Sequence, residues 1–415
     1  MNYKKFLLIL LFSFALFIRL YNYENRFTFG PEQARSLVVS GNYIKDKLSF
    51  LGQEQFRVTS QGHKLFSGAL FSYTLVPLQL LFNFDPVPIS IFFAILNVAT
   101  GALLFFLVQK VFGFKTAFFS ATLFLFSAHM INHSMFIWIL NYYPVIGLLT
   151  AYFIYLFHKK EKSSLALLLG VASGVGFNFY YLFLPFAVGI FVYLAVRSKK
   201  KVKSLALFLL GALIGNFTMI AFDVRHDFYH LRILLEYSHD VFTGVGEKNV
   251  SLFHLLNIWP LLAVIGGIAL GRLFKKSRAP ALLVLAIYIF LNLFSYLVDF
   301  SKPVGMSEGL FYRDILAASD IIAEDATYGS FNVSSLLDFD KRGYILRYPL
   351  EFLYDRHPMG VEDYPVSDKL YVLAETNYNF DESGVWEVRT FDPFTVVKLG
   401  DVGQGYEVLR LDRVN

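Results

Sequence analysis

The segment ISIFFAILNVATGALLFFLVQ, residues 89–109, decides the class of fold, because it holds no charged side chain over its whole length. A helix of about 20 apolar residues crosses the roughly 30 Å hydrocarbon core of a bilayer. Hydrophobic residues make up 56% of the chain and charged residues 17%, whereas soluble domains carry about 25% charged residues. The sequence therefore predicts a polytopic membrane protein built mainly from helices.

Eight further apolar runs are long enough to be predicted as spans. They lie near 6–20, 116–137, 143–157, 164–182, 183–195, 204–222, 252–271 and 280–298. A tenth run, FSGALFSYTLVPLQLLF at 66–82, is shorter and carries Pro77 near its centre.

The basic clusters assign the run at 66–82, because cytoplasmic loops are enriched in Lys and Arg. If the segment 66–82 stays at the outer interface, the nine spans place all five clusters on the same side of the membrane, together with a single acid, Glu161. If the segment 66–82 crosses the membrane, the first cluster lies on the opposite side from the other four. The clusters are Lys4/Lys5, Lys110/Lys115, Lys159/Lys160/Lys162, Arg197 to Lys203, and Arg272/Lys275/Lys276/Arg278. We therefore predict nine spans, a cytoplasmic amino terminus held by an uncleaved anchor, and a juxtamembrane or re-entrant helix at 66–82.

Charge divides the chain into two expected domains. Residues 301–415 hold 11 Lys and Arg against 20 Asp and Glu, a net charge of −9, whereas the preceding 300 residues carry +14. We expect a transmembrane domain over 1–299, with juxtamembrane helices within 32–82, and an extracytoplasmic α/β domain over 300–415. In this tail the spacing of LFYRDILAASDIIAED (310–325) predicts a helix, and GYILRYPL, KLYVLAE and WEVRTF are typical of strands. No catalytic motif stands out there, so the tail is expected to cap or gate the membrane site or to present an acceptor.

Several classes of chemistry lack support. The chain has no cysteine, which excludes disulfides, zinc-thiolate sites and cysteine nucleophiles. It has no HExxH, CxxC, GxGxxG or Walker pattern, and we expect no nucleic-acid partner. Only one acid is a strong candidate for a site, and a tightly bound divalent metal usually has several carboxylate ligands. A tightly bound metal is therefore disfavoured, and whether the protein requires a divalent ion stays open.

On this topology ionisable residues gather only at the outer face. They are Glu32, Arg35, Arg57, His63, Lys64, Asp223, Arg225, His226 and Asp227. Glu32 lies in FTFGPEQAR (27–35), directly after the first apolar run, where charged groups near hydrocarbon are costly and usually functional. Two simpler explanations remain: Glu32 as an acid in the first turn of a helix that begins with Pro31, and Arg35 as its partner on the helix surface.

The other candidates have simpler explanations too. His63 and Lys64 precede the segment at 66–82, where a lysine commonly extends to lipid headgroups. The stretch AFDVRHDF (221–228) could be an anchoring rim, although four charged or titratable residues in five positions are dense for one.

The order of these parts resembles the GT-C glycosyltransferases, in particular the dolichyl-phosphate-mannose-protein mannosyltransferases and aminoarabinose transferases. The resemblance rests on FTFGPEQAR, EQARSLVVSGNYIKDKL, GHKLFSGALFSYTLVPLQLLF, ILNVATGALLFFLVQKVFG, LLLGVASGVGFNFYYLFLP and FLLGALIGNFTMIAFDVRHDF. It covers about residues 1–230, and the remainder only in general plan. Where the family has an Asp, often followed by Glu or Gln, this chain has Glu32 and Gln33; where relatives often carry His-Tyr, it has Tyr180 and Tyr181.

The resemblance implies an enzyme of the plasma membrane that moves a sugar from a polyprenyl-phosphate carrier to an acceptor hydroxyl on the outer face. An inverting transfer needs a carboxylate base, for which Glu32 is the candidate. The donor phosphate needs cations; Lys64 and Arg225 are the leading candidates and Arg35, His63 and His226 the secondary ones. Its partners would be membrane lipid, the lipid-linked sugar, and a glycan, lipid or protein acceptor, with no cofactor besides the donor.

Two alternatives remain open. A transporter or flippase for a lipid-linked sugar would use the same cations without transfer, but it should carry polar or charged residues at mid-membrane depth. A non-catalytic binding protein would leave the residues around Glu32 unexplained.

Overall fold

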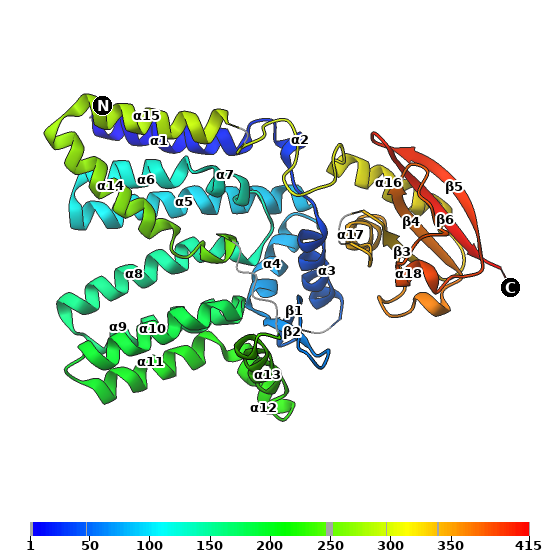
Figure 1. Cartoon of the computed structure of the whole chain (residues 1–415), viewed down its shortest axis with the longest axis horizontal. Helices are drawn as coiled ribbons and strands as arrows, with labels where there is room; N and C mark the ends of the chain where they lie inside the picture. The colour runs from blue at the N-terminus through cyan, green and yellow to red at the C-terminus, as the bar shows by residue number, and fades with distance from the viewer. Residues whose placement is uncertain (1–2, 47, 246–251, 296, 338–339, 415) are drawn as a thin grey trace.

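The computed structural model describes residues 3–46, 48–245, 252–295, 297–337 and 340–414, with the backbone alone at 56 and 57. Long helices form one end of the elongated molecule, and a small domain with a four-stranded sheet forms the other (Figure 1). A layer of short helices and a β-hairpin lies between them. The prediction of a mainly helical protein with a small carboxyl-terminal α/β domain is therefore confirmed.

Each predicted span is helical over most of its described residues. The helices are α1 Tyr3–Leu20, α5 Pro86–Phe112, α6 Phe114–Leu125, α7 Ala128–His133, α8 Tyr143–Lys160, α9 Ser163–Phe179, α10 Leu184–Arg197, α11 Lys201–Gly215, α12 Phe217–Arg225, α14 Trp259–Lys276 and α15 Arg278–Phe294. Short 3₁₀ turns join some of them, at Ile139–Tyr142, Tyr181–Phe183 and Leu252–Leu255.

Fewer of these helices are both long and apolar enough to cross a bilayer alone. In the described part of the chain, α5 and the continuous segment Ile139–Lys160 qualify, and α11 with α12 would be a third if the pair, bent by 77°, is one span. The other helices are shorter or carry several charges at their ends, as α1 does with Lys4, Lys5 and Arg19. The number of nine spans stays a prediction.

Small residues bring α9 and α11 into close contact. Gly170 and Gly174 are four residues apart on α9, as are Gly211 and Gly215 on α11. A Cβ atom added to Gly170 would lie 2.0 Å from the Phe208 carbonyl oxygen, and one added to Gly211 would lie 2.2 Å from that of Leu167. Such small-xxx-small pairs allow two backbones to touch, which is a common way to pack helices in membranes.

One arginine lies inside the helical bundle. Arg19 of α1 is fully buried, and its guanidinium donates to the Ala15 carbonyl (2.8 Å), the Asn97 side chain (2.8 Å) and the Leu125 carbonyl (3.0 Å). These bonds join α1 to α5 and to the end of α6. Since a buried charge is tolerated only where it is hydrogen-bonded, Arg19 has a structural explanation.

The intermediate layer contains the predicted juxtamembrane helices. Helix α3, Pro31–Lys45, lies where the sequence predicts a helix, and the short α2, Tyr23–Arg26, precedes it. The segment 66–82 is only partly helical: α4 covers Leu70–Leu81, while β2, Lys64–Gly68, pairs antiparallel with β1, Leu51–Val58.

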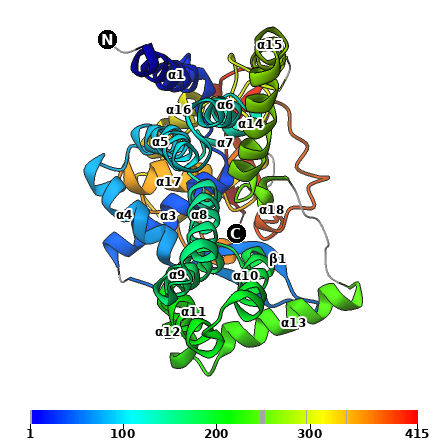
Figure 2. The same cartoon turned by 90° about the vertical axis from the view of Figure 1, so that its left-hand side faces the viewer.

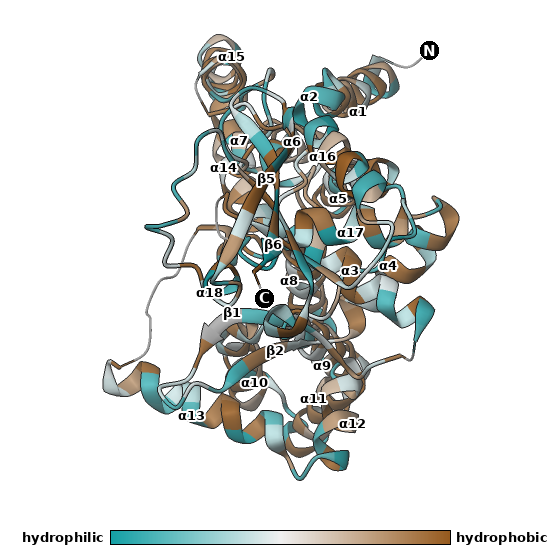
Figure 3. Ribbon diagram, turned by 90° about the vertical axis from the view of Figure 1, so that its right-hand side faces the viewer, coloured by the Kyte–Doolittle hydropathy of each residue, from teal (hydrophilic) through white to brown (hydrophobic). Residues whose placement is uncertain are grey.

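Helix α13, Tyr229–Thr243, supports the hairpin formed by β1 and β2. His230 Nε2 lies 3.0 Å from the Phe66 carbonyl oxygen, and Asp240 accepts the Ser60 amide at 2.7 Å. Figure 3 shows polar and apolar bands alternating along α13.

The carboxyl-terminal domain has a mixed sheet. Its elements are α16 Tyr312–Asp325, β3 Phe331–Ser335, α17 Tyr344–Phe352, β4 Lys369–Glu375, α18 Trp386–Arg389, β5 Phe394–Val402 and β6 Tyr406–Arg413, with a 3₁₀ turn at Tyr364–Val366. The strand order is β3-β4-β6-β5, parallel between β3 and β4 and antiparallel elsewhere. The predicted helix at 310–325 and the strand KLYVLAE are confirmed.

The strand predictions for GYILRYPL and WEVRTF are wrong. Asp340 accepts the backbone amides of Tyr344 and Ile345, both at 2.9 Å, and Gly343 adopts a left-handed conformation with φ 63°. This carboxylate caps the amino terminus of α17, so a helix forms where apolar alternation indicated a strand. In WEVRTF, only the single turn of α18 is regular.

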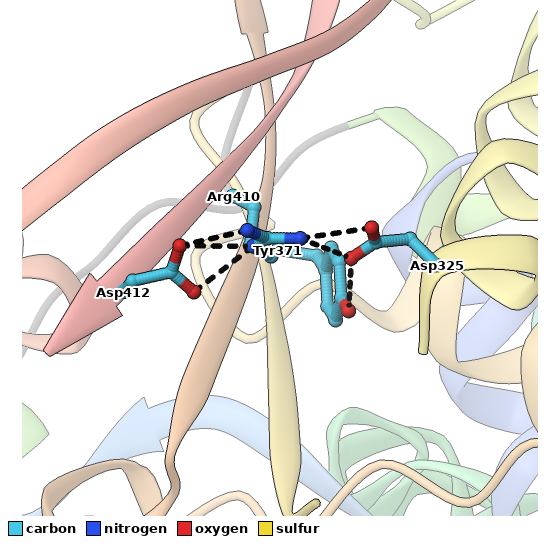
Figure 4. Close-up of polar contacts among 4 residues, drawn as sticks. All are labelled: Asp325, Tyr371, Arg410 and Asp412. Carbon is cyan, nitrogen blue, oxygen red and sulfur yellow. Dashed lines mark hydrogen bonds and ion pairs between the residues drawn. The ribbon is translucent and has the colours of Figure 1, made fainter. Parts of the chain in front are cut away.

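A polar cluster joins α16 to this sheet (Figure 4). The Arg410 guanidinium contacts Asp325 at 2.8 Å and Asp412 at 2.9 Å. The Tyr371 hydroxyl donates to the same Asp325 carboxylate at 2.7 Å. Both carboxylates of the cluster accept from Arg410, and Asp325 also accepts from Tyr371, an arrangement that is typical of a structural role.

Candidate active site at the start of helix α3

The stretch before α3 is held between the helical bundle and the carboxyl-terminal domain. Phe27 and Phe29 are buried, and their rings lie 5.0 and 4.9 Å from the ring of Tyr312 on α16. The Thr28 hydroxyl donates to the Val304 carbonyl at 3.1 Å. Gln33 then accepts the Gly30 amide at 3.0 Å, and Pro31 occupies the first turn. These contacts fix where α3 begins, and with it the position of Glu32.

Glu32 lies in the wall of a cavity of about 900 Å³. Apolar side chains form most of the other walls, among them Phe136, Trp138 and Phe253. The loop at 304–306 closes one side, and Met306 Sδ lies 3.3 Å from the Phe29 amide. The cavity thus combines a carboxylate with surfaces suited to an apolar or partly apolar ligand.

Burial raises the pKa of the Glu32 carboxyl group, and the Arg35 charge and a hydrogen bond from Trp138 offset this in part. A carboxyl group in such surroundings takes up a proton more readily than an exposed one. This property suits a general base, because a base works best when its pKa lies nearer the working pH. A perturbed carboxyl group in the wall of a cavity makes the start of α3 a candidate functional site.

A second, polar pocket of about 240 Å³ adjoins the first, and Pro31 lines both. Arg35, Glu54 and the segment 340–344 of the carboxyl-terminal domain line it. Burial lowers the pKa of the Arg35 guanidinium, while the charges of Glu32 and Glu54 raise it. The structure therefore brings Glu32 and Arg35 together, and it adds cations from a domain in which the sequence showed no catalytic motif.

Lys64 belongs to an ion-pair network at the same pocket. Its Nζ lies 3.4 Å from Glu54 Oε2 and 3.9 Å from Glu362 Oε1. Arg342 contacts the same two carboxylates, both at 3.6 Å. Since Glu54 also lines the pocket of Arg35, one cluster of charges joins Lys64 of the hairpin to the carboxyl-terminal domain. The sequence placed Lys64 before a helix, whereas it begins strand β2.

The remaining predicted cations make their described contacts away from this cluster. His63 Nδ1 lies 2.9 Å from Glu236 of α13. The Arg225 guanidinium lies 5.1 Å from the ring centre of Phe50, and His226 Nδ1 lies 2.8 Å from the Phe222 carbonyl oxygen. The side chain of Arg57 lies outside the described residues. The roles of His63, Arg225 and His226 in phosphate binding stay predictions.

One of the charged residues in AFDVRHDF (221–228), Asp223, has a structural role. Asp223 accepts the backbone amides of His230 (2.8 Å) and Leu231 (3.3 Å). It therefore satisfies two amides in the first turn of α13, as capping side chains do.

Trp138, Lys341 and Arg342 line the candidate site but were not predicted from the sequence. Trp138 lies in an apolar stretch with no polar pattern around it. Lys341 and Arg342 are the only adjacent pair of cations in the acidic residues 301–415, which is the signal that could have indicated them. Among the residues that the structure describes, no group of three or more His, Cys, Asp or Glu side chains is placed to hold a metal ion.

Comparison with known proteins bears on the family and the fold of the chain. Residues 68–222 match the family model described as dolichyl-phosphate-mannose-protein mannosyltransferase. No curated protein sequence matches the chain.

Solved structures resemble the chain over more of its length than residues 68–222. ArnT from Cupriavidus metallidurans bound to undecaprenyl phosphate superposes with a TM-score of 0.63 at 12% identity, covering 97% of each chain. The apo form of the same protein gives the same values. A weaker likeness, with a TM-score of 0.49 and 11% identity over 88% of this chain and 68% of the other, is to the Archaeoglobus fulgidus oligosaccharyltransferase.

The match at 12% identity establishes a shared fold, which includes the carboxyl-terminal domain because it covers nearly the whole chain. The resemblance drawn from the sequence is thus confirmed: residues 68–222 match the mannosyltransferase model, and the chain has the fold of ArnT.

Proposed function

We propose that this protein is an inverting membrane glycosyltransferase that moves a sugar from a polyprenyl-phosphate carrier to an acceptor hydroxyl at the extracytoplasmic face of the plasma membrane. The observation that carries the proposal is the placement of Glu32, a partly buried carboxylate beside Arg35, in the wall of a largely apolar cavity. The ArnT with the same fold was crystallised with undecaprenyl phosphate, which supports a lipid-phosphate substrate of this class.

In the proposed reaction Glu32 takes the proton of the acceptor hydroxyl. The acceptor oxygen bonds to the anomeric carbon as the bond from that carbon to the phosphate oxygen breaks. The electron pair of the broken bond stays on the phosphate, which leaves with its lipid. Trp138, as a hydrogen-bond donor to Glu32, holds the carboxylate in position.

Cations stabilise the negative charge that grows on the leaving phosphate. Arg35 is the leading candidate because it lies beside Glu32. Lys64 is the next, since a phosphate could replace Glu54 or Glu362 as its partner. Arg225, His63 and His226 are kept as candidates that would act only if the hairpin and the end of α12 shift toward the donor.

The carrier needs an apolar surface, which the aromatic walls of the large cavity supply. We propose that the carboxyl-terminal domain completes the site, because its loop at 304–306 closes the cavity and its segment 340–344 lines the polar pocket.

The test is to incubate membranes that contain the protein with a panel of radiolabelled polyprenyl-phosphate sugars, and to identify the labelled product. We expect a new glycosidic bond and release of polyprenyl phosphate, both about 10²- to 10⁴-fold slower in membranes with Glu32→Gln. A transporter would instead move the intact labelled lipid across the bilayer without cleaving it. Such an outcome, or consumption of no donor in the panel, would overturn the proposal.

A further inference from the structure

A second large cavity lies at the opposite end of the helical bundle from the carboxyl-terminal domain. It is formed by the start of α1, the turn between α5 and α6 and the turn between α14 and α15, and has a volume of about 800 Å³. Figures 1 and 2 show these segments together at the end of the bundle that carries the amino terminus. We call this cavity the basic groove.

Four cations line the basic groove: Lys4, Lys115, Lys275 and Arg278. No carboxylate is found among the described residues that line it. The basic turn between α10 and α11 differs in this respect, because Lys199 there contacts Glu161 at 3.7 Å. The groove therefore has a concentrated positive charge that attracts an anion.

Aromatic rings hold the cations and form the walls. Lys115 Nζ and the Arg278 guanidinium lie 5.0 and 6.0 Å from the ring centre of Phe274. Lys4 Nζ lies 5.3 Å from that of Phe114. Such cation–π contacts keep flexible side chains near an apolar surface. The ligand that fits the groove must therefore carry both a negative charge and an apolar part.

Two helices begin at the groove without a capping side chain. Helix α6 starts at Phe114 after Gly113, and α15 starts at Arg278 after Ser277, and neither preceding residue makes a side-chain cap bond. The first amides of a helix and its dipole favour an anion. Together with the cations, these amides give an anion two kinds of partner.

We infer that the basic groove binds an anionic glycerophospholipid of the cytoplasmic leaflet. Its phosphate would lie among the cations and the helix amides, and its acyl chains would lie along the phenylalanine rings. Basic pockets between membrane helices on the cytoplasmic side are suited to such headgroups. This inference does not depend on the proposed transferase activity, since the groove lies at the other end of the bundle from α3, the helix that contains Glu32 (Figure 1).

The test uses the full-length protein purified in a neutral detergent. Phosphatidylglycerol or phosphatidylcholine with the same acyl chains is added, and bound lipid is counted by native mass spectrometry. The variant removes three charges (Lys115→Gln, Lys275→Gln and Arg278→Gln). The matched control removes three exposed charges at the start of α11 (Lys200→Gln, Lys201→Gln and Lys203→Gln).

We expect the native protein and the control to retain phosphatidylglycerol in preference to phosphatidylcholine. The groove variant should bind phosphatidylglycerol about tenfold more weakly or worse, because each cation near an anionic headgroup contributes. Thermal unfolding in detergent verifies that all three proteins are folded. Equal retention of both lipids by the native protein, or equal losses in the groove variant and the control, would show that the groove is not a specific lipid site.

Discussion

Replacement of Glu32 by Gln tests the proposed chemistry most directly. Gln has nearly the same shape and can still accept the hydrogen bond from Trp138, but it cannot take a proton from an acceptor. Loss of a positioned general base lowers turnover by about 10² to 10⁴, equivalent to roughly 3–5 kcal/mol of activation free energy. Donor binding should change little, because the cations that face the phosphate remain.

The raised pKa of Glu32 adds a dependence on pH. The protonated carboxyl group is inactive as a base, so turnover of the native enzyme should fall as pH is lowered through the pKa of Glu32. Because burial raises that pKa, the decline should begin at a higher pH than for an exposed glutamate. In Glu32→Gln this acid limb should be absent from the residual activity.

The same shift fixes the sign of the effect on stability. A carboxyl group whose pKa is raised on folding stabilises the fold fully below its unfolded-state pKa, and this contribution is lost as pH rises through the folded-state pKa. At neutral pH the Gln variant should therefore unfold at no lower temperature than the native protein. A loss of turnover without a loss of thermal stability separates catalysis from helix capping.

The assay measures transfer from the accepted donor in membranes at matched protein levels, over a range of pH. Glu24→Gln is the control, because Glu24 is an exposed acid in the same connection after α1. If Glu32→Gln retains turnover within about threefold of this control, Glu32 is not the base, and the helix-capping explanation holds.

Three other predictions follow from the same structure. A cysteine introduced at Asp381 should react with an impermeant thiol reagent added to intact cells, whereas a cysteine introduced at Ser163 should not. The chain has no native cysteine that would react as well, and the reverse labelling pattern would overturn the proposed topology. Arg35→Ala and Lys64→Ala should each weaken the use of donor by about ten- to a hundredfold, because each would lose a charged hydrogen bond of roughly 1.5–3 kcal/mol. The measurement is the dependence of transfer on donor concentration, and the same measurement on Arg225→Ala and Arg225→Lys decides whether Arg225 takes part. Unchanged kinetics in the Arg35 and Lys64 variants would show that the phosphate binds elsewhere. Gly211→Ala should destabilise the bundle by about 1–3 kcal/mol through overpacking. Gly189→Ala is the control and should not, because no atom lies within 4 Å of the added Cβ. Equal thermal unfolding of these two variants would show that α9 and α11 can separate without cost.

The sequence alone predicted the features that depend on local composition. Long apolar runs predicted the helices, because a backbone in hydrocarbon must satisfy its own hydrogen bonds. The charge difference between residues 1–300 and 301–415 predicted two domains in different surroundings. Pro31, with an acid after it and a basic residue one turn later, predicted the start of α3. The resemblance to GT-C enzymes followed from the order of these local features.

The tertiary structure decided what depends on contacts between distant segments. Local pattern indicated a strand at 343–350, but the buried carboxylate of Asp340 caps a helix there. Lys64, a residue of the hairpin, contacts Glu362 of the other domain, nearly 300 residues later in the chain. Trp138 reaches Glu32, and the segment 340–344 lines a pocket with Arg35. These contacts could not be predicted from residue spacing, because they join segments that are far apart in the sequence and meet only in the folded protein. The chain thus displays its membrane fold and its candidate base locally, while the groups around that base are assembled by packing.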